Sequence, residues 1–173
     1  ADSGALVTRE NGWTYLEAGN VASISPAVGQ LNSVITISGA RLFAGGSSVS
    51  DVTFLGVKAT IRDQTDDEIV VVLGSSATSA GDVMTLLSES GAIIDTTGLF
   101  TYVTEGAVAT VSPNVGQVGT KVTISGERLR GSGSEVETVT LAGVDVDSIR
   151  IRLHLVWWRG DRPKVCHMDV IAP

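Results

Sequence analysis

The stretch VASISPAVGQ at residues 21–30 recurs as VATVSPNVGQ at residues 108–117, and the likeness continues well beyond it. TISGARL is followed 87 residues later by TISGERL, and VTFLGV by VTLAGV. Without a gap, residues 21–57 and 108–144 are identical at 20 of 37 positions. Self-similarity at a fixed period is the signature of a repeat array. The sequence therefore predicts tandem copies of one structural unit.

The same offset extends upstream, where SGALVTRENGWTYLEAG at residues 3–19 aligns with SGAIIDTTGLFTYVTEG at residues 90–106. We therefore expect three segments. Residues 1–19 form the last strand of a preceding or neighbouring repeat, residues 20–106 a complete unit, and residues 107–173 a second unit that is incomplete and divergent after residue 149. A unit of this length can bury a modest core of its own.

Almost every segment of the chain has strand character. The clearest apolar or β-branched runs are SVITIS (33–38), DVTFLGV (51–57), EIVVVL (68–73), DVMTLLS (82–88) and LFTYV (99–103). Clusters of Gly, Ser and Asp separate them, and no stretch keeps a helical period. This pattern predicts an all-β fold of sandwich type. Asn11-Gly12, between LVTRE and WTYL, predicts a hairpin with a type I′ turn.

The composition limits the partners that the chain can have. The net charge is −7 and the isoelectric point is near 4.7, whereas a nucleic-acid surface needs a basic patch. No apolar run approaches the roughly 20 residues that span a bilayer. We therefore expect neither a nucleic-acid partner nor direct membrane insertion. The single Cys excludes an intramolecular disulfide.

Polar clusters in the two units offer little chemistry. Asp66, Asp67 and Glu68 could contribute to a calcium site, but no loop places acidic residues at alternate positions, so a solvated turn is expected. Arg41 and Arg128 occupy equivalent positions beside the TISG turn, where pairing with an acid or packing of the stem is expected. The sequence predicts no catalytic residue, no cofactor and no metal.

The composition changes abruptly over residues 150–173. This segment holds five of the twelve Lys and Arg residues, both His, the single Cys and two of the three Trp. IRIRLHLVWW at residues 149–158 alternates and predicts a strand with one apolar face. Asp169-Val170 also falls 87 residues after Asp82-Val83. The segment is either a diverged repeat or a misread or foreign sequence.

The C-terminal segment contains residues for three kinds of site: a zinc site, a Cys–His nucleophile and an aromatic interface. His154, Cys166 and His167 supply at most three of the four ligands of a zinc site, and a Cys–His nucleophile needs a third, orienting group. Trp157 and Trp158 could form an exposed interface, although Trp157 suits a core position equally well.

The residues quoted above resemble the IPT/TIG family of immunoglobulin-like domains. The resemblance rests on V-x-x-[IV]-S-P-x-x-G-Q, [VI]-T-I-S-G-x-x-L, V-x-x-V-T-[FL]-x-G-V, TDDEIVVV and GLFTYV, and it covers about residues 3–149. It implies tandem two-sheet sandwiches without an active site. Members occur in cell-surface receptors, in long surface arrays of microbes and protists, and in some transcription factors. This version looks most like the long arrays of unicellular eukaryotes.

Two functions are therefore weighed. In the first, the chain is a structural repeat of an extracellular or cell-surface filament or adhesion protein. It opens within a last strand and stops before the last strand of another unit, so residues 1–18 of one copy could complete the next copy by strand addition. Trp13, Tyr15 and Leu16 would anchor that strand, with Trp157 and Trp158 as further interface candidates. Alternatively, covalent neighbours supply the missing strands.

In the second, sandwich-end loops bind a glycan or a protein ligand at the cell surface. No aromatic cluster in the loops favours this role, whereas an exposed Trp157–Trp158 pair would. A transcription-factor role fits the acidic charge poorly, and an enzyme is the least expected function.

Overall fold

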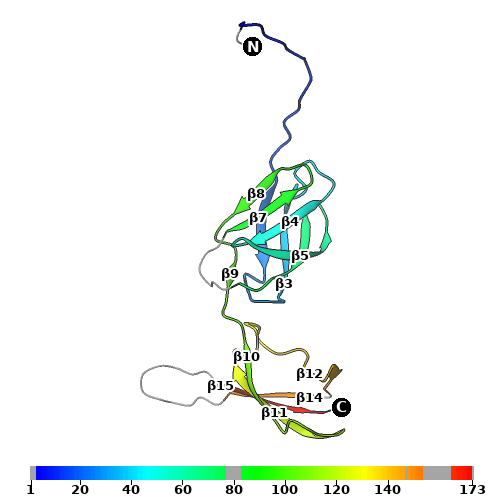
Figure 1. The fold of residues 1–173 in the computed structure, drawn as a ribbon, viewed down its shortest axis with the longest axis vertical. Helices are drawn as coiled ribbons and strands as arrows, with labels where there is room; N and C mark the ends of the chain where they lie inside the picture. Colours follow the sequence, from blue (N-terminus) through cyan, green and yellow to red (C-terminus); the bar gives the residue numbers. More distant parts are fainter. Residues whose placement is uncertain (1–2, 77–82, 147, 154–164, 173) are drawn as a thin grey trace, which may run out of the picture.

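The computed structural model describes residues 3–76, 83–146, 148–153 and 165–172, with the backbone alone at 151–153 and 165–167. Two β-structured units follow one another along the long axis, and the N-terminal segment extends beyond the first unit (Figure 1). No helix with the length and hydrophobicity of a membrane span occurs in this described part of the chain.

The first unit is a sandwich of two antiparallel layers that share one strand. One layer contains, in order, β1 (Asn20–Ser25), β3 (Val34–Ala40), β6 (Glu68–Val72) and β5 (Val57–Gln64). The other continues from β5 to β4 (Val49–Phe54), β7 (Met84–Ser88) and β8 (Ile93–Thr96). β5 serves both layers, because residues 57–59 pair with β4 and residues 60–64 pair with β6. The predicted all-β, immunoglobulin-like sandwich is confirmed.

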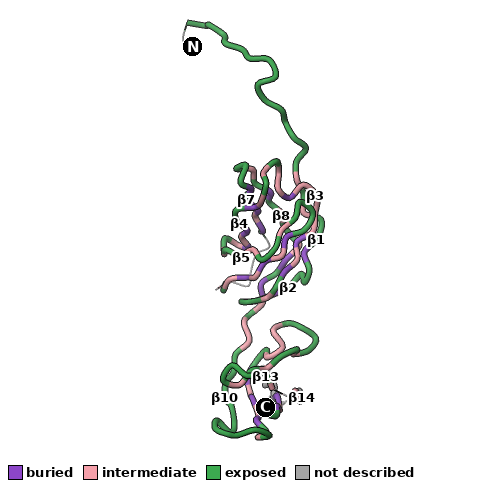
Figure 2. The backbone as a smooth tube through the Cα atoms, turned by 90° about the vertical axis from the view of Figure 1, so that its right-hand side faces the viewer, coloured by how far each residue is buried: buried purple, intermediate pink, exposed green. Residues whose placement is uncertain are grey.

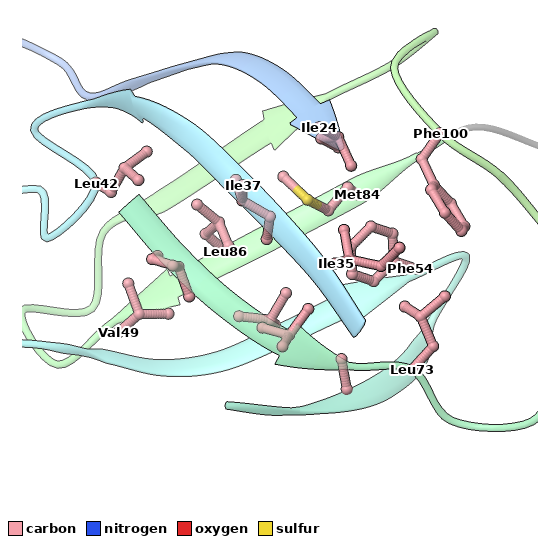
Figure 3. Close-up of a cluster of buried hydrophobic side chains, with 14 of the residues drawn as sticks. Ile24, Ile35, Ile37, Leu42, Val49, Phe54, Leu73, Met84, Leu86 and Phe100 are labelled. Carbon is pink, nitrogen blue, oxygen red and sulfur yellow. The ribbon is translucent and has the colours of Figure 1, made fainter. Parts of the chain in front are cut away.

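The core of this sandwich follows from the alternation of its strands. On β3, Ile35 and Ile37 are fully buried while Val34 faces solvent, as a period of two dictates. Figure 3 shows side chains from both layers meeting in one cluster. Two short strands, β2 (Val28–Gly29) and β9 (Thr101–Tyr102), pair in parallel at one end.

Tight hairpin turns occur, but not where the sequence indicated. Leu55-Gly56 joins β4 to β5 with φ angles of 53° and 77°, and both positive angles are those of a type I′ turn. Asn11 also has a positive φ of 56°, yet residues 3–19 form no strand, so the predicted hairpin is wrong. An isolated two-stranded hairpin without a packed face is at best marginally stable.

The second unit repeats the beginning of the first. Its strands are β10 (Ala107–Ser112), β11 (Lys121–Glu127), β12 (Thr140–Leu141), β13 (Val144–Asp145), β14 (Ser148–Leu153) and β15 (Val165–Ile171). β10 pairs with β11 as β1 pairs with β3, and both pairs carry a register shift at the same place, between Val21 and Ser23 and between Val108 and Thr110.

β15 interrupts the 87-residue offset. It pairs with β11 and β14, which is the place that β6 holds between β3 and β5. Val34 pairs with Val72, 38 residues later, whereas Lys121 pairs with Ile171, 50 residues later. The second unit therefore reaches this strand twelve residues late, and Asp169 takes the place of Val70 opposite the corresponding threonine.

The described part of the second unit consequently contains counterparts of β1 and β3–β6 but none of β7, β8 or β9. The second core is correspondingly small. Its buried hydrophobic residues are Val122, Ile124, Met168 and Val170.

Candidate functional site

The N-terminal segment is exposed along its described length (Figure 2). Trp13 and Tyr15 contact each other edge to face, with ring centroids 6.1 Å apart. Tyr15 is 90% exposed, whereas Tyr102, its counterpart 87 residues later, is 2% exposed. Leu16 is also exposed, but its Cδ1 lies so close to Gly45 that a Cβ there would approach it to 2.7 Å. The WTYL segment therefore carries exposed apolar surface.

Beyond this segment the chain is held to the first sandwich by an arginine, and the same contact recurs at the second unit. The Arg41 Nε–H donates to the Ala18 carbonyl at 3.1 Å, and the Arg128 Nε–H donates to the Glu105 carbonyl at 2.9 Å. We call these two contacts the arginine clasps. Each spans 23 residues, and the two lie 87 residues apart.

Both arginines also pair with an acid, as the sequence predicted. Arg41 contacts Glu17 at 3.2 Å and Arg128 contacts Glu127 at 2.8 Å. These pairs are exposed and contribute little stability. The arginine clasps therefore act mainly by orienting the chain as it enters each unit.

A glycine makes each clasp possible. A Cβ at Gly106 would lie 2.6 Å from the Arg128 carbonyl oxygen, and a Cβ at Gly19 would overlap the Arg41 carbonyl oxygen in the same way. Because only glycine permits so close an approach of two backbone segments, the chain path into both units is fixed by the same residue type.

Gln30 connects the end of the first unit to the beginning of the second. Its side-chain oxygen accepts the Gly106 N–H at 3.1 Å. Its own N–H bonds Ser33 Oγ at 3.0 Å, and the counterpart Gln117 N–H bonds Thr120 Oγ1 at 2.9 Å. The loop after each Ser-Pro pair therefore has the same local geometry. Sequence reasoning did not single out either glutamine, although both end the repeated VGQ motif.

In the first unit, the loop after the Ser-Pro pair binds the closing strand β9. The Thr101 N–H donates to the Ala27 carbonyl at 2.9 Å, and the Val103 N–H donates to the Gly29 carbonyl at 2.8 Å. Phe100 is buried against Phe54, with ring centroids 4.9 Å apart. In the first unit, two hydrogen bonds and two aromatic side chains thus cover this end of the sandwich.

At the corresponding place the second unit has an open groove. It has a volume of about 400 Å³ and a largely apolar lining, with Val111, Pro113, Asn114, Val115, Gly116, Gln117, Val118, Val122, Leu141, Ala142, Val144 and Ala172. We call it the acceptor groove. Val115 is 79% exposed where its counterpart Val28 is 41% exposed, and Val111 is 40% exposed where Ile24 is 7% exposed.

Ala172 takes the place of Leu73 at the base of this groove. In the first unit, Leu73 N–H bonds the Ser33 carbonyl at 3.0 Å; in the second, Ala172 N–H bonds the Thr120 carbonyl at 2.8 Å. The Leu73 carbonyl accepts from Asn32, and the Ala172 carbonyl accepts from Gly119. The backbone around the groove therefore repeats that of the first unit, although the chain arrives twelve residues late.

The acidic cluster considered for calcium supports a loop. Asp66 Oδ1 accepts the Phe43 N–H at 2.8 Å, and its carbonyl accepts the Leu42 N–H. Within the described ranges, no three His, Cys, Asp or Glu residues gather where a metal ion could bind. Elsewhere, hydrogen bonds from Ser47 and Ser48 lower the pKa of the exposed Glu89 carboxyl.

The remaining candidates lie partly or wholly outside the described residues. Trp157, Trp158 and His154 belong to the segment that the structure does not describe. Cys166 and His167 lie on β15, but only their backbone is described. Their predicted roles stay untested.

Comparisons with known proteins agree with this fold. A family model described as the IPT/TIG domain matches residues 20–102. Among solved structures, the full extracellular region of plexin A4 has a TM-score of 0.54 at 19% identity, covering 90% of this chain and 12% of that one. At this identity the likeness concerns the fold alone, and the chain spans a small part of the plexin region.

Two bacterial proteins also align with the chain. The surface glycan-binding protein PbSGBP-B from Prevotella bryantii aligns at a TM-score of 0.41 and 18% identity, covering 92% of this chain and 37% of that one. An auxiliary nutrient binding protein from Bacteroides ovatus aligns at 0.41 and 16% identity, covering 61% and 25%. A comparison with curated proteins finds no match.

Proposed function

We propose, from the match of residues 20–102 to the IPT/TIG domain, a non-enzymatic immunoglobulin-like family, that the chain is a non-catalytic structural repeat of an extracellular or cell-surface protein. Its role is to hold successive sandwiches in a fixed order and direction. The partners are neighbouring repeats or other copies of the same protein, joined covalently or head to tail by strand complementation with residues 1–18.

The observation that carries this proposal is the repeated joint. The arginine clasp, the glycine beneath it and the glutamine loop recur at the same offset, so the chain enters each unit along the same path. Gln30 adds a hydrogen bond from one unit to the chain entering the next. These contacts give the chain the same direction at each entry, which supports a spacer role.

A loop-based binding role has less support. The aromatic residues in the described loops between strands of the first sandwich are Phe43 and Phe100, and both pack against its core. Trp13 and Tyr15 are exposed, but their rings cross at 78° and so form no flat platform for a sugar.

The proposal is tested by loosening the joint. Gln30→Ala combined with Arg128→Ala removes the hydrogen bonds to Gly106 and Glu105 that these two side chains make, and leaves both cores intact. Small-angle X-ray scattering should show one extended shape for the parent chain and a wider range of lengths for the double variant. Arg62→Ala, on an exposed part of β5, is the matched control and should scatter like the parent.

All these chains should carry Trp13→Ala so that self-association does not disturb the scattering. Equal flexibility in the parent and in the double variant would contradict a stiff spacer. Surface labelling of intact cells that express the gene provides the second test, because label that appears only after permeabilisation would contradict an extracellular role.

A further inference from the structure

We propose that the acceptor groove of the second unit binds the WTYL segment, residues 13–16, of a second copy as a parallel strand. This inference rests on the proposed function, since it supplies the non-covalent form of the head-to-tail joint. In the first unit, residues 100–103 are the counterpart of the WTYL segment, and they already pair in parallel with β2 at the place that corresponds to the groove.

The first unit sets the register of the bound segment. Moving its two hydrogen bonds by 87 residues pairs the Thr14 N–H with the Asn114 carbonyl and the Leu16 N–H with the Gly116 carbonyl. Trp13 then takes the place of Phe100, and Tyr15 that of Tyr102. Strand addition of this kind draws affinity from backbone hydrogen bonds and specificity from alternate side chains.

The side-chain volumes are complementary. In the first unit, Phe100 lies near Phe54 and Leu73 (Figure 3). The corresponding groove residues are the smaller Leu141 and Ala172, while the incoming residue is the larger Trp13. A larger side chain meeting smaller walls keeps the packing dense, as protein interiors require.

The groove is also organised before its ligand arrives. Gln117 and Thr120 hold the loop in the geometry that Gln30 and Ser33 have around the bound β9. We expect the Gln117 side chain to accept the Gly19 N–H of the incoming copy, as Gln30 accepts that of Gly106. Preorganisation lowers the entropy cost of binding.

The WTYL segment comes from a second copy because the WTYL segment of the same chain cannot reach this groove. The WTYL segment leaves the first sandwich at one end, and the second unit lies at the other (Figure 1). Donor and acceptor are different surfaces, so the contact is heterologous and propagates unless the rotation closes a ring. In a longer polypeptide, the following repeat could fill the groove instead, and the experiment separates these occupants.

The test uses two variants of the 173-residue chain, each of which lacks one half of the joint. Trp13→Ala with Tyr15→Ala removes the donor side chains and leaves the groove intact. Val115→Lys places a charge in the groove and leaves the donor intact. All three positions are highly exposed, so neither chain should lose its fold. Val7→Ala in the N-terminal segment and Val108→Lys on β10 are matched controls at exposed apolar positions.

Analytical ultracentrifugation should find each half-joint chain monomeric and their equimolar mixture a heterodimer that grows no further. The controls should associate like the parent, and Trp13→Ala alone should weaken association about tenfold or more, as expected for a buried aromatic anchor. The inference is overturned if the mixture stays monomeric or if either half-joint chain associates like the parent.

Failure here and failure of the proposed function give different results. A monomeric mixture with a stiff joint between the two units leaves the structural repeat intact and assigns the groove to a covalent neighbour. A flexible joint contradicts the structural role whether or not copies associate.

Discussion

At the scale of single residues, Gly39 shows how closely β1 and β3 approach. A Cβ at this position would overlap the Asn20 carbonyl and lie 2.8 Å from Leu42 Cδ2. Gly126 has the same surroundings in the second unit, against Ala107 and Leu129. The glycine of the TISG motif is therefore required by contact with the neighbouring strand.

We predict that Gly39→Ala lowers the free energy of unfolding by about 1–3 kcal/mol, because the added methyl group forces β1 away from β3. Urea denaturation followed by fluorescence measures the change. Gly12→Ala is the control, since its Cβ would lie 3.4 Å from the nearest atom in an exposed turn. Equal stability of the two variants would contradict the close approach.

Tyr102 makes the stability depend on alkaline pH. Burial raises the pKa of its phenol above the usual value, so the folded state holds the proton more tightly than the unfolded state. The stabilisation is complete below the unfolded pKa of about 10 and is lost as the pH rises through the folded pKa.

Tyr102→Phe removes this ionisation together with a hydrogen bond of 3.3 Å to the Gly74 carbonyl. We expect the variant to be less stable than the parent near neutral pH by about 1 kcal/mol or less, and the difference to shrink at higher pH. Denaturant midpoints measured from about pH 8 upward decide this. Parallel curves for both proteins would show that the phenol does not contribute.

The backbone contacts of the arginines and of Gln30 could not be predicted from the sequence. Arg41 and Arg128 could be predicted to pair with acids, because a charged residue repeated beside a turn needs a partner. Their contact with a backbone carbonyl 23 residues earlier could not, since it depends on the path of the chain around the sandwich. The role of Gln30 is likewise visible only once the two units are placed.

At the scale of elements, Asp66 secures the loop between β3 and β4. We predict that Asp66→Ala destabilises the first unit by about 1 kcal/mol, because the Phe43 N–H loses its acceptor. Asp67→Ala is the control, since the Asp67 carbonyl that accepts the Gly39 N–H is retained. Thermal melts of both variants measure the effect.

The same melts test the calcium hypothesis. Neither added Ca²⁺ nor a chelator should shift the parent midpoint if the carboxylate serves the loop. A calcium-dependent rise that Asp66→Ala abolishes would restore a metal site at this turn.

Most strands could be predicted from the sequence, because apolar runs between turn residues mark them. β8 was not singled out. β5 was missed because its polar positions hide a strand that changes layer at residues 59–60. β15 was not predicted, since strand pairing across 50 residues depends on long-range contacts and not on the repeat offset. Thr123 and Asp169 face each other there and are joined by a 2.8 Å hydrogen bond.

At the scale of the whole molecule, the repeat could be predicted from the sequence but the acceptor groove could not. Identity at 20 of 37 positions indicates two similar units. The groove emerges only when Val115 and Val111 are compared with Val28 and Ile24 in the folded chain, because exposure depends on what the closing strand covers.

The chain thus carries the exposed apolar WTYL segment beyond one end of the first sandwich and the acceptor groove in the second unit. The central claim is that this segment and this groove join copies in one direction. The chain spans 12% of the plexin extracellular region, and that likeness concerns the fold alone. Whether copies join must therefore be measured on this chain.

Light scattering of the purified 173-residue chain over a range of concentrations tests most directly whether copies join. The account predicts a mass that rises with concentration in steps of the 17.9 kDa chain, without a preferred end point unless a ring closes. A mass of 17.9 kDa at every concentration would contradict it, and the WTYL segment would then have no role in joining separate copies.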